Sequence, residues 1–209
     1  MIIHTITHKR TNMYIIGNSE KYILFDCLWH DSFSVIKNAL KEHGIAFPQI
    51  TGALISHFHP DHAGTFEILR QHGVRPLVLE WQMPHIEWLN SFFTKPKNDS
   101  QGKYMPIDIE TLTPIKPDTA KEILSDCGID GKILCTCGHS EDGMSLIAGN
   151  VVFVGDLPRF EVAESYGGEV AASWRKISEY NVTEIYYAHG NTPEDIEAIE
   201  KWKAEHLDM

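Results

Sequence analysis

The sequence predicts a mixed α/β fold in which blocks of strands alternate with helices. Short apolar runs at residues 13–17 and 22–26 are separated by turn-forming residues, which indicates a β-hairpin. Segments with apolar side chains at helical spacing follow, and the same succession of strands and helices recurs after about residue 131. No long internal repeat or low-complexity tract interrupts this order.

The composition favours one domain over residues 1–209. A chain of 209 residues with 43% hydrophobic residues can bury a substantial core. The formal charge of −11 and the lack of a basic run disfavour nucleic acid as a partner. Residues 1–7 lack a signal-peptide pattern, and no apolar run approaches the roughly 18 residues of a membrane span. We therefore expect a soluble, cytoplasmic protein without a membrane partner, and homo-oligomer formation is left open.

The four cysteines predict no disulfide framework, because they are spread over a chain long enough to fold without one. Cys135 and Cys137 are two positions apart, so a strand would place them on the same face, as in some thiolate sites. The favoured interpretation is that both are small buried side chains of a core strand.

In the first half, the hairpin precedes a predicted helix at residues 31–44, which ends at a glycine. A buried strand is expected at residues 50–56, a second helix at 63–73 and a further strand at 75–80. The segment SHFHPDHAG, residues 56–64, therefore lies at a strand-to-helix junction.

From residue 81 to 118 the pattern becomes irregular and rich in aromatic residues, prolines and polar residues. It indicates an insertion or lid, with a packed surface excursion as the alternative. Strands are then expected at 131–137, 144–149, 150–156 and 184–190, with a partly helical segment at 164–180. A closing helix is expected at 192–207, with Thr192 as N-cap and Pro193 at the first helical position.

The cluster HFHPDH has the spacing of a metal site. On extended backbone His57 and His59 project to the same side, where both imidazoles can reach one ion. Asp61 and His62 follow at the helix start and can reach a second point a few ångströms away. Imidazole and carboxylate suit zinc, iron or manganese, and the absence of thiolate argues against a closed structural zinc site.

Further metal-competent residues occur just past later buried strands. His139 stands in GHS, Asp156 in GDL and His189 in AHG, each next to a glycine or alanine where strand ends converge. Each of these residues alone is weak evidence for a metal site, but together they strengthen the interpretation of HFHPDH as part of one.

These motifs, in this order and over nearly the whole chain, resemble the metallo-β-lactamase superfamily. The resemblance implies a four-layer αββα sandwich whose metal site lies at one edge, between the two sheets. The opening hairpin is similar too, although Cys27 stands where a small residue pair often follows the family's aspartate. The metal ligands that the resemblance implies are His57, His59 and His139 for the first metal, Asp61, His62 and His189 for the second, and Asp156 as the bridge.

Such a centre predicts a hydrolase that uses a metal-activated hydroxide, because two divalent cations lower the pKa of a shared water toward about 7. Two ions are expected, with zinc favoured and iron or manganese accepted by the same ligands. Asp61 is the expected catalytic residue, since it can orient the nucleophile and pass its proton to the leaving group. The expected substrate is a small ester, thioester or lactone.

Two other functions use the same site. A phosphodiesterase would need a cationic clamp, for which Arg159 is the candidate closest in sequence to a ligand. An iron-dependent redox enzyme of the superfamily is the other alternative, although its diiron pattern usually has Glu where His59 stands. Tyr166 is the candidate substrate-binding residue. Trp81, Tyr104 and Phe160 could add apolar surface, with ordinary packing as the favoured interpretation for each.

Overall fold

The computed structural model describes residues 1–195, and of Glu164, Glu194 and Asp195 it describes only the backbone. Two five-stranded sheets have the strand orders β1-β2-β3-β4-β5 and β10-β9-β8-β7-β6. The strands are β1 (Ile2–His8), β2 (Thr11–Gly17), β3 (Tyr22–Phe25), β4 (Ile50–Leu54), β5 (Pro76–Leu77), β6 (Gly131–Cys135), β7 (Met144–Ala148), β8 (Val151–Gly155), β9 (Glu184–Tyr187) and β10 (Glu194–Asp195). The helices are α1 (Phe33–Glu42), α2 (Pro60–Ala63), α3 (Phe66–Gln71), α4 (Ile86–Phe93), α5 (Pro117–Asp126) and α6 (Gly168–Ser178), with short 3-10 helices η1 (Phe47–Gln49), η2 (Glu80–His85), η3 (Ile109–Thr111) and η4 (Phe160–Tyr166).

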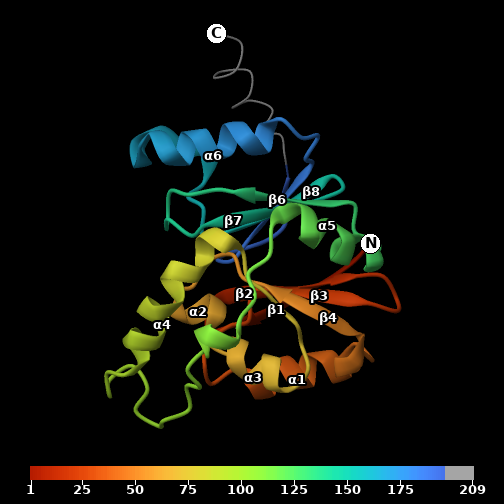
Figure 1. Cartoon of the computed structure of the whole chain (residues 1–209). Helices are drawn as coiled ribbons and strands as arrows, with labels where there is room; N and C mark the ends of the chain where they lie inside the picture. The colour runs from red at the N-terminus through yellow and green to blue at the C-terminus, as the bar shows by residue number, and fades with distance from the viewer. Residues whose placement is uncertain (196–209) are drawn as a thin grey trace.

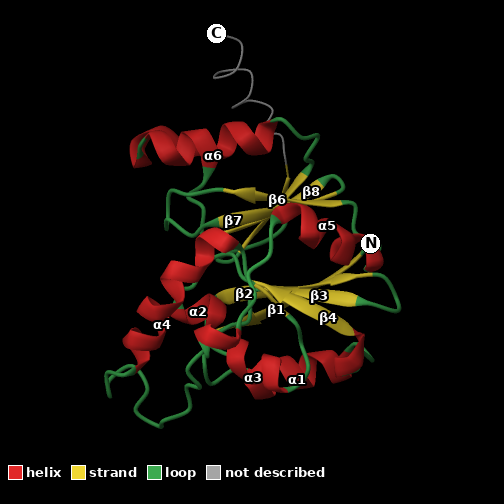
Figure 2. Cartoon of the chain, in the orientation of Figure 1, coloured by secondary structure: helices red, strands yellow, loops and turns green. Residues whose placement is uncertain are grey.

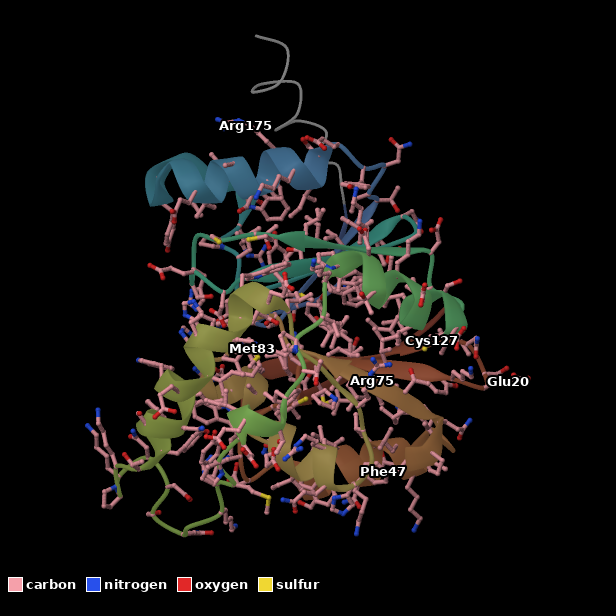
Figure 3. The ribbon with its side chains drawn as sticks, viewed as in Figure 1. Glu20, Phe47, Arg75, Met83, Cys127 and Arg175 are labelled. Atoms are coloured by element: carbon pink, nitrogen blue, oxygen red, sulfur yellow. The ribbon has the colours of Figure 1, made fainter. Side chains whose placement is uncertain are left out.

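Helices cover the outer faces of both sheets, α1 and α3 on the first and α6 on the second (Figures 1 and 2). Arg175 on α6 and Phe47 beyond α1 mark the two opposite outer layers (Figure 3). The predicted four-layer αββα sandwich is thus confirmed.

Three buried apolar clusters correspond to the three boundaries between these layers. The first joins one face of the first sheet to α1 and α3, and the third joins the second sheet to α6 around Trp174. The middle cluster lies between the sheets, where Phe153 of β8 meets Tyr14 of β2 at a ring-centroid distance of 4.9 Å and Phe25 of β3 at 5.5 Å. Helix α5 joins this cluster through Ala120 and Leu124.

The strands next to the predicted ligands include both predicted hairpins. Strands β2 and β3 form the antiparallel hairpin, and β3 pairs with β4 in parallel. Strands β7 and β8 form the second hairpin around Gly149, whose φ of +62° suits glycine. Parallel pairing of β8 with β9 brings the carboxyl ends of these two strands to one edge of the second sheet.

The segment 81–118 is more regular than its composition suggested. Residues 86–93 form α4, with Ile86, Leu89 and Phe93 buried at helical spacing. Tyr104 packs back on this helix, its ring 4.1 Å from that of Phe93, and its hydroxyl donates to Asn90 Oδ1. Helix α4 approaches the start of α2, where the Trp88 ring lies 5.2 Å from that of His59, the N-cap of α2. The role of α4 as a lid stays a prediction.

The expected helix start at residues 192–195 is wrong. Glu194 and Asp195 form β10, which pairs antiparallel with Ile185 and Glu184 on the edge of the second sheet. The Thr192 hydroxyl does not cap a helix; it accepts a hydrogen bond from the Tyr187 amide at the end of β9. Pairing with an open strand edge therefore outweighs the local capping pattern. Residues 196–207 of the expected helix lie outside the described residues.

Within residues 1–195, no helix has the length and apolar character needed to cross a membrane.

Replacing Phe153 by alanine should lower the free energy of unfolding by about 3–5 kcal/mol, because the fully buried ring joins both sheets and its loss leaves a cavity. Urea denaturation followed by circular dichroism measures the change. Val162→Ala, at a side chain 42% exposed, is the control and should shift stability by no more than about 0.5 kcal/mol. Equal effects of the two substitutions would contradict a core role for Phe153.

Candidate metal centre

The segment HFHPDH turns directly from β4 into α2. His59 is the N-cap of α2 in extended conformation, and Pro60 occupies the first helical position. The His62 carbonyl accepts a hydrogen bond from the Cys27 amide, which ties the short helix to the loop after β3. A Cβ on Gly64 would lie 2.2 Å from the His30 amide nitrogen, so glycine is required for this close approach. The strand-to-helix junction thus fixes the direction of the ligand side chains.

All the side chains predicted as metal ligands come together at this edge. Their ligand atoms form three overlapping groups, each with all atoms within 4.8 Å of one another. The middle group shares His57 with the first and His62 with the third. The groups are His57, His59 and His139; His57, His62 and Asp156; and Asp61, His62 and His189.

Asp156 lies between the two outer groups. Its Oδ2 is 3.3 Å from His62 Nε2 and 3.4 Å from His139 Nε2, and its Oδ1 is 3.2 Å from His189 Nε2. Asp61 Oδ2 is 3.3 Å from His189 Nε2. One carboxylate therefore faces histidines of both outer groups, as a bridging ligand must.

The nitrogen and oxygen atoms of these side chains are placed better for binding a metal ion than for hydrogen bonding to one another. His57 Nε2, His62 Nε2 and Asp156 Oδ1 are buried without a hydrogen-bond partner of good geometry among the described residues. Leaving such atoms unpaired is costly, whereas a cation bound between them would satisfy all three. Nitrogen and carboxylate oxygen are ligands that zinc, iron and manganese accept. The residues thus fit the metal that their chemistry implies.

The electrostatics of the cluster agree with this fit. The carboxylates of Asp156 and Asp61, 3.2 and 3.3 Å from its Nε2, raise the pKa of His189 to about 10. Burial acts to raise the pKa of Asp156, but the close approach of His189 and His62 outweighs it and holds that pKa far below the usual value. Burial lowers the pKa of His57 well below that of a free imidazole. Without a metal, protons on some histidines balance the two carboxylates, and a cation would replace that charge.

Two residues behind the ligands were not predicted from the sequence. Asp26, fully buried at the end of β3, lies 2.9 Å from His62 Nδ1 through Oδ2 and accepts the Ser56 amide through Oδ1. The Ser56 hydroxyl donates to Asp26 and lies 3.1 Å from His57 Nδ1. A carboxylate behind a ligating histidine orients the ring and makes it a better ligand. The signal in the sequence was a charged residue closing the buried run YILFD.

The turn between β1 and β2 supports the second group. The Thr11 hydroxyl donates to Asp61 Oδ2 at 3.1 Å, and the carbonyl of Arg10 lies 2.7 Å from His189 Nδ1. The Asn12 amide bonds to the carbonyl of Ala188 next to His189. The first hairpin of the chain therefore holds ligands that come from α2 and from the end of β9.

The site is closed on one side and open on the other. The side chains of His57 and His62 are 2% and 0% exposed, whereas those of His139 and His189 are 37% and 42% exposed. A pocket of about 270 Å³ adjoins the open side and includes Arg159, whose guanidinium lies 4.7 Å from the Tyr187 ring centroid.

The predicted apolar wall residues lie in different surroundings. Phe160 is buried against Trp174, and Trp81 packs beside the middle apolar cluster. Tyr166 is 64% exposed at the end of η4, and its role in substrate binding stays a prediction. Together with the stacking of Tyr104 on Phe93, these contacts favour ordinary packing for Trp81, Tyr104 and Phe160.

The cysteine pair does not join the metal groups. Cys135 Sγ lies 3.6 Å from Cys137 Sγ at the end of β6, and burial raises the pKa of Cys137 to about 11. A thiol with that pKa stays protonated at neutral pH and is a poor ligand or nucleophile.

Asp26→Asn should weaken metal binding about 10- to 100-fold, because the isosteric amide removes the charge behind His62. Competition with a chelator measures the affinity. Asp31→Asn, which loses only a surface ion pair with Lys9, is the matched control and should leave the affinity unchanged. Equal affinities of Asp26→Asn and the unmodified protein would contradict this role for Asp26.

Comparison with known proteins agrees with the observed fold. Among solved structures, a metallo-beta-lactamase family protein from Thermus thermophilus is 17% identical, with a TM-score of 0.65 over 99% of this chain and 79% of that one. A metallo-beta-lactamase variant from Cronobacter sakazakii is 12% identical, with a TM-score of 0.67 over 90% of this chain and 75% of the other. A mutant of the metallo-beta-lactamase from Legionella gormanii is 17% identical, with a TM-score of 0.62 over 90% and 76%. At these identities the likeness shows the fold alone.

Among curated proteins, none matches the sequence significantly. The family model described as the metallo-beta-lactamase superfamily matches residues 6–189, which include every predicted ligand. The chain therefore belongs to the metallo-beta-lactamase superfamily.

Proposed function

We propose that the protein is a hydrolase that uses two divalent metal ions to cleave a small ester, thioester or lactone. The observation that carries the proposal is the overlap of three ligand groups at one sheet edge, the middle one joined to the first through His57 and to the third through His62. Two neighbouring sites that share a carboxylate are what a dinuclear hydrolytic centre requires.

The ligand sets of the proposal follow the groups. His57, His59 and His139 would hold the first ion, Asp61, His62 and His189 the second, and Asp156 would bridge them. Zinc is the ion we favour, although the same donors accept iron and manganese. When bound, the ions would lower the pKa of water toward about 7 and polarise the bond under attack.

Asp61 is the residue that we propose moves the proton. The Thr11 hydroxyl holds Oδ2 of its carboxylate. Burial acts to raise the pKa of Asp61, but the hydrogen bond with His189 and the charge of His62 outweigh it, so the carboxylate is ionised at neutral pH. An ionised, oriented carboxylate can accept the proton of the attacking water and deliver it to the leaving group.

The exposed side of the candidate metal centre and the charge of the chain support a small substrate. His139 and His189 lie at the accessible end, so a substrate would approach from there. The formal charge of −11 opposes binding of an extended polyanion such as nucleic acid.

A second candidate is hydrolysis of a small phosphodiester. It is favoured by Arg159, which lines the same pocket as His139, Asp156 and His189. A guanidinium beside a metal site suits the two oxygens of a phosphate.

Asp61→Asn should keep the circular dichroism spectrum and lose about 100-fold or more of the turnover, because an amide accepts no proton. Steady-state hydrolysis of the best ester substrate measures the loss. Turnover equal to that of the unmodified protein would contradict the role of Asp61.

Protein purified without added metal should contain two divalent ions per chain and lose hydrolysis when they are removed by a chelator. The measurement is elemental analysis, combined with a screen of p-nitrophenyl esters, thioesters, lactones and bis-p-nitrophenyl phosphate. Preference for the phosphodiester would favour the second candidate. One ion per chain, or bound iron without any hydrolysis, would overturn the proposal.

A further inference from the structure

Helix α4 exposes an aromatic side chain where a surface helix usually carries polar ones. Ile86, Leu89 and Phe93 form its buried face, but Trp88 on the opposite side is 52% exposed. The Trp88 ring lies 5.7 Å from that of Phe92, one turn further along. Half of a large apolar side chain thus remains in contact with water, and the packing of the chain does not account for it.

The exposed tryptophan lies next to the metal centre. Its ring centroid is 5.2 Å from that of His59, which belongs to the first ligand group. A pocket of about 160 Å³ opens between them, and its lining residues are Phe58, His59, His85, Trp88, Ser140 and Asp142. A group placed in this pocket would contact Trp88 while the rest of the same molecule reaches the ligands.

The wall that carries Trp88 is anchored to both sheets. The Gln82 side chain, fully buried in η2, donates to the carbonyls of Ile55 and Asp142. The Asp142 carboxylate accepts the Phe58 amide at 2.6 Å. At the other end of α4, the Asn90 side chain donates to the carbonyl of Ile107. The pocket is therefore preorganised, which lowers the entropy cost of binding.

The charges around the pocket favour neither an anionic nor a cationic occupant. The Asp142 carboxylate in the lining opposes an anionic group and attracts a cationic one. A divalent ion on His59 would do the reverse, so the two charges offset each other. The aromatic wall formed by Trp88 is suited to a flat apolar group, which stacks on the indole.

We propose that this pocket binds a neutral aromatic ring carried by the acyl part of the substrate, with Trp88 as the residue that determines this specificity. The inference rests on the proposed hydrolysis and names its substrate class: esters or thioesters of arylalkyl carboxylic acids. Because the acyl part would lie beside Trp88, the leaving group would lie in the separate pocket on the side of His189, which Arg159 lines.

The test compares p-nitrophenyl phenylacetate with p-nitrophenyl acetate, which share a leaving group. Trp88→Ala should lower kcat/KM for the phenylacetyl ester about tenfold, mainly through KM, because a hydrophobic contact is lost. For the acetyl ester the change should stay within about twofold. Trp88→Phe, which keeps an aromatic face, should restore most of the preference. Val162→Ala, at another exposed apolar side chain, should change neither substrate.

A binding measurement separates this inference from the proposed function. In a saturation-transfer NMR titration with zinc-loaded protein, the phenyl protons of phenylacetate should receive magnetisation, and Trp88→Ala should raise the apparent Kd for phenylacetate about tenfold while leaving that for acetate unchanged. If no ester is hydrolysed but the Kd for phenylacetate depends on Trp88 in this way, the proposed hydrolysis is wrong and the inference about the pocket is supported. Equal effects of Trp88→Ala on both esters, or an unchanged Kd for phenylacetate, would overturn the inference.

Discussion

The buried carboxylate of Asp26 is the contact on which the candidate metal centre depends. It lies at the end of β3 without exposure to solvent and bonds to both the backbone and the hydroxyl of Ser56. Through Oδ2 it also meets His62 Nδ1, so a single side chain fixes the start and the end of the ligand segment. A buried charge is costly unless it is paired and hydrogen-bonded, and this arrangement meets both conditions. Hydrogen bonds within the protein therefore hold the side chains of the turn from β4 into α2 in place.

The sandwich supplies the remaining ligands by bringing strand ends together. His139 follows β6, Asp156 follows β8 and His189 follows β9, and these strands lie in one sheet. The ligands in HFHPDH come from the other sheet. Packing of Tyr14 and Phe25 against Phe153 holds the two sheets together, so the apolar core and the metal centre depend on the same boundary. The substrate contacts that we propose, by contrast, would come from segments outside this frame, such as α4 and the loop with Arg159.

Local patterns in the sequence predicted most of the fold and the edge at which the candidate ligands meet. Alternating apolar runs and the glycines at their ends identify the hairpins, and metal-competent residues just past buried strands identify the edge where they meet. The roles of Asp26 and Ser56 were not predicted, because they depend on contacts with His62 and His57 that only the tertiary structure creates. Thr192-Pro193 has the pattern of a helix start, but the edge of β9 offers backbone partners that a local pattern does not contain. The environment of an aromatic residue is equally nonlocal: Phe160 is buried and Trp88 is exposed.

The contact of His189 with the Arg10 carbonyl spans 179 positions of the chain. A candidate ligand from near the last described strand is thus held by the first hairpin, and the proposed second ion site is assembled only when these distant segments have met. A growing chain emerging from the ribosome would display HFHPDH long before it could complete this site. An ion at the proposed second site would therefore need the finished fold, and by linkage it would stabilise that state over every partly folded one.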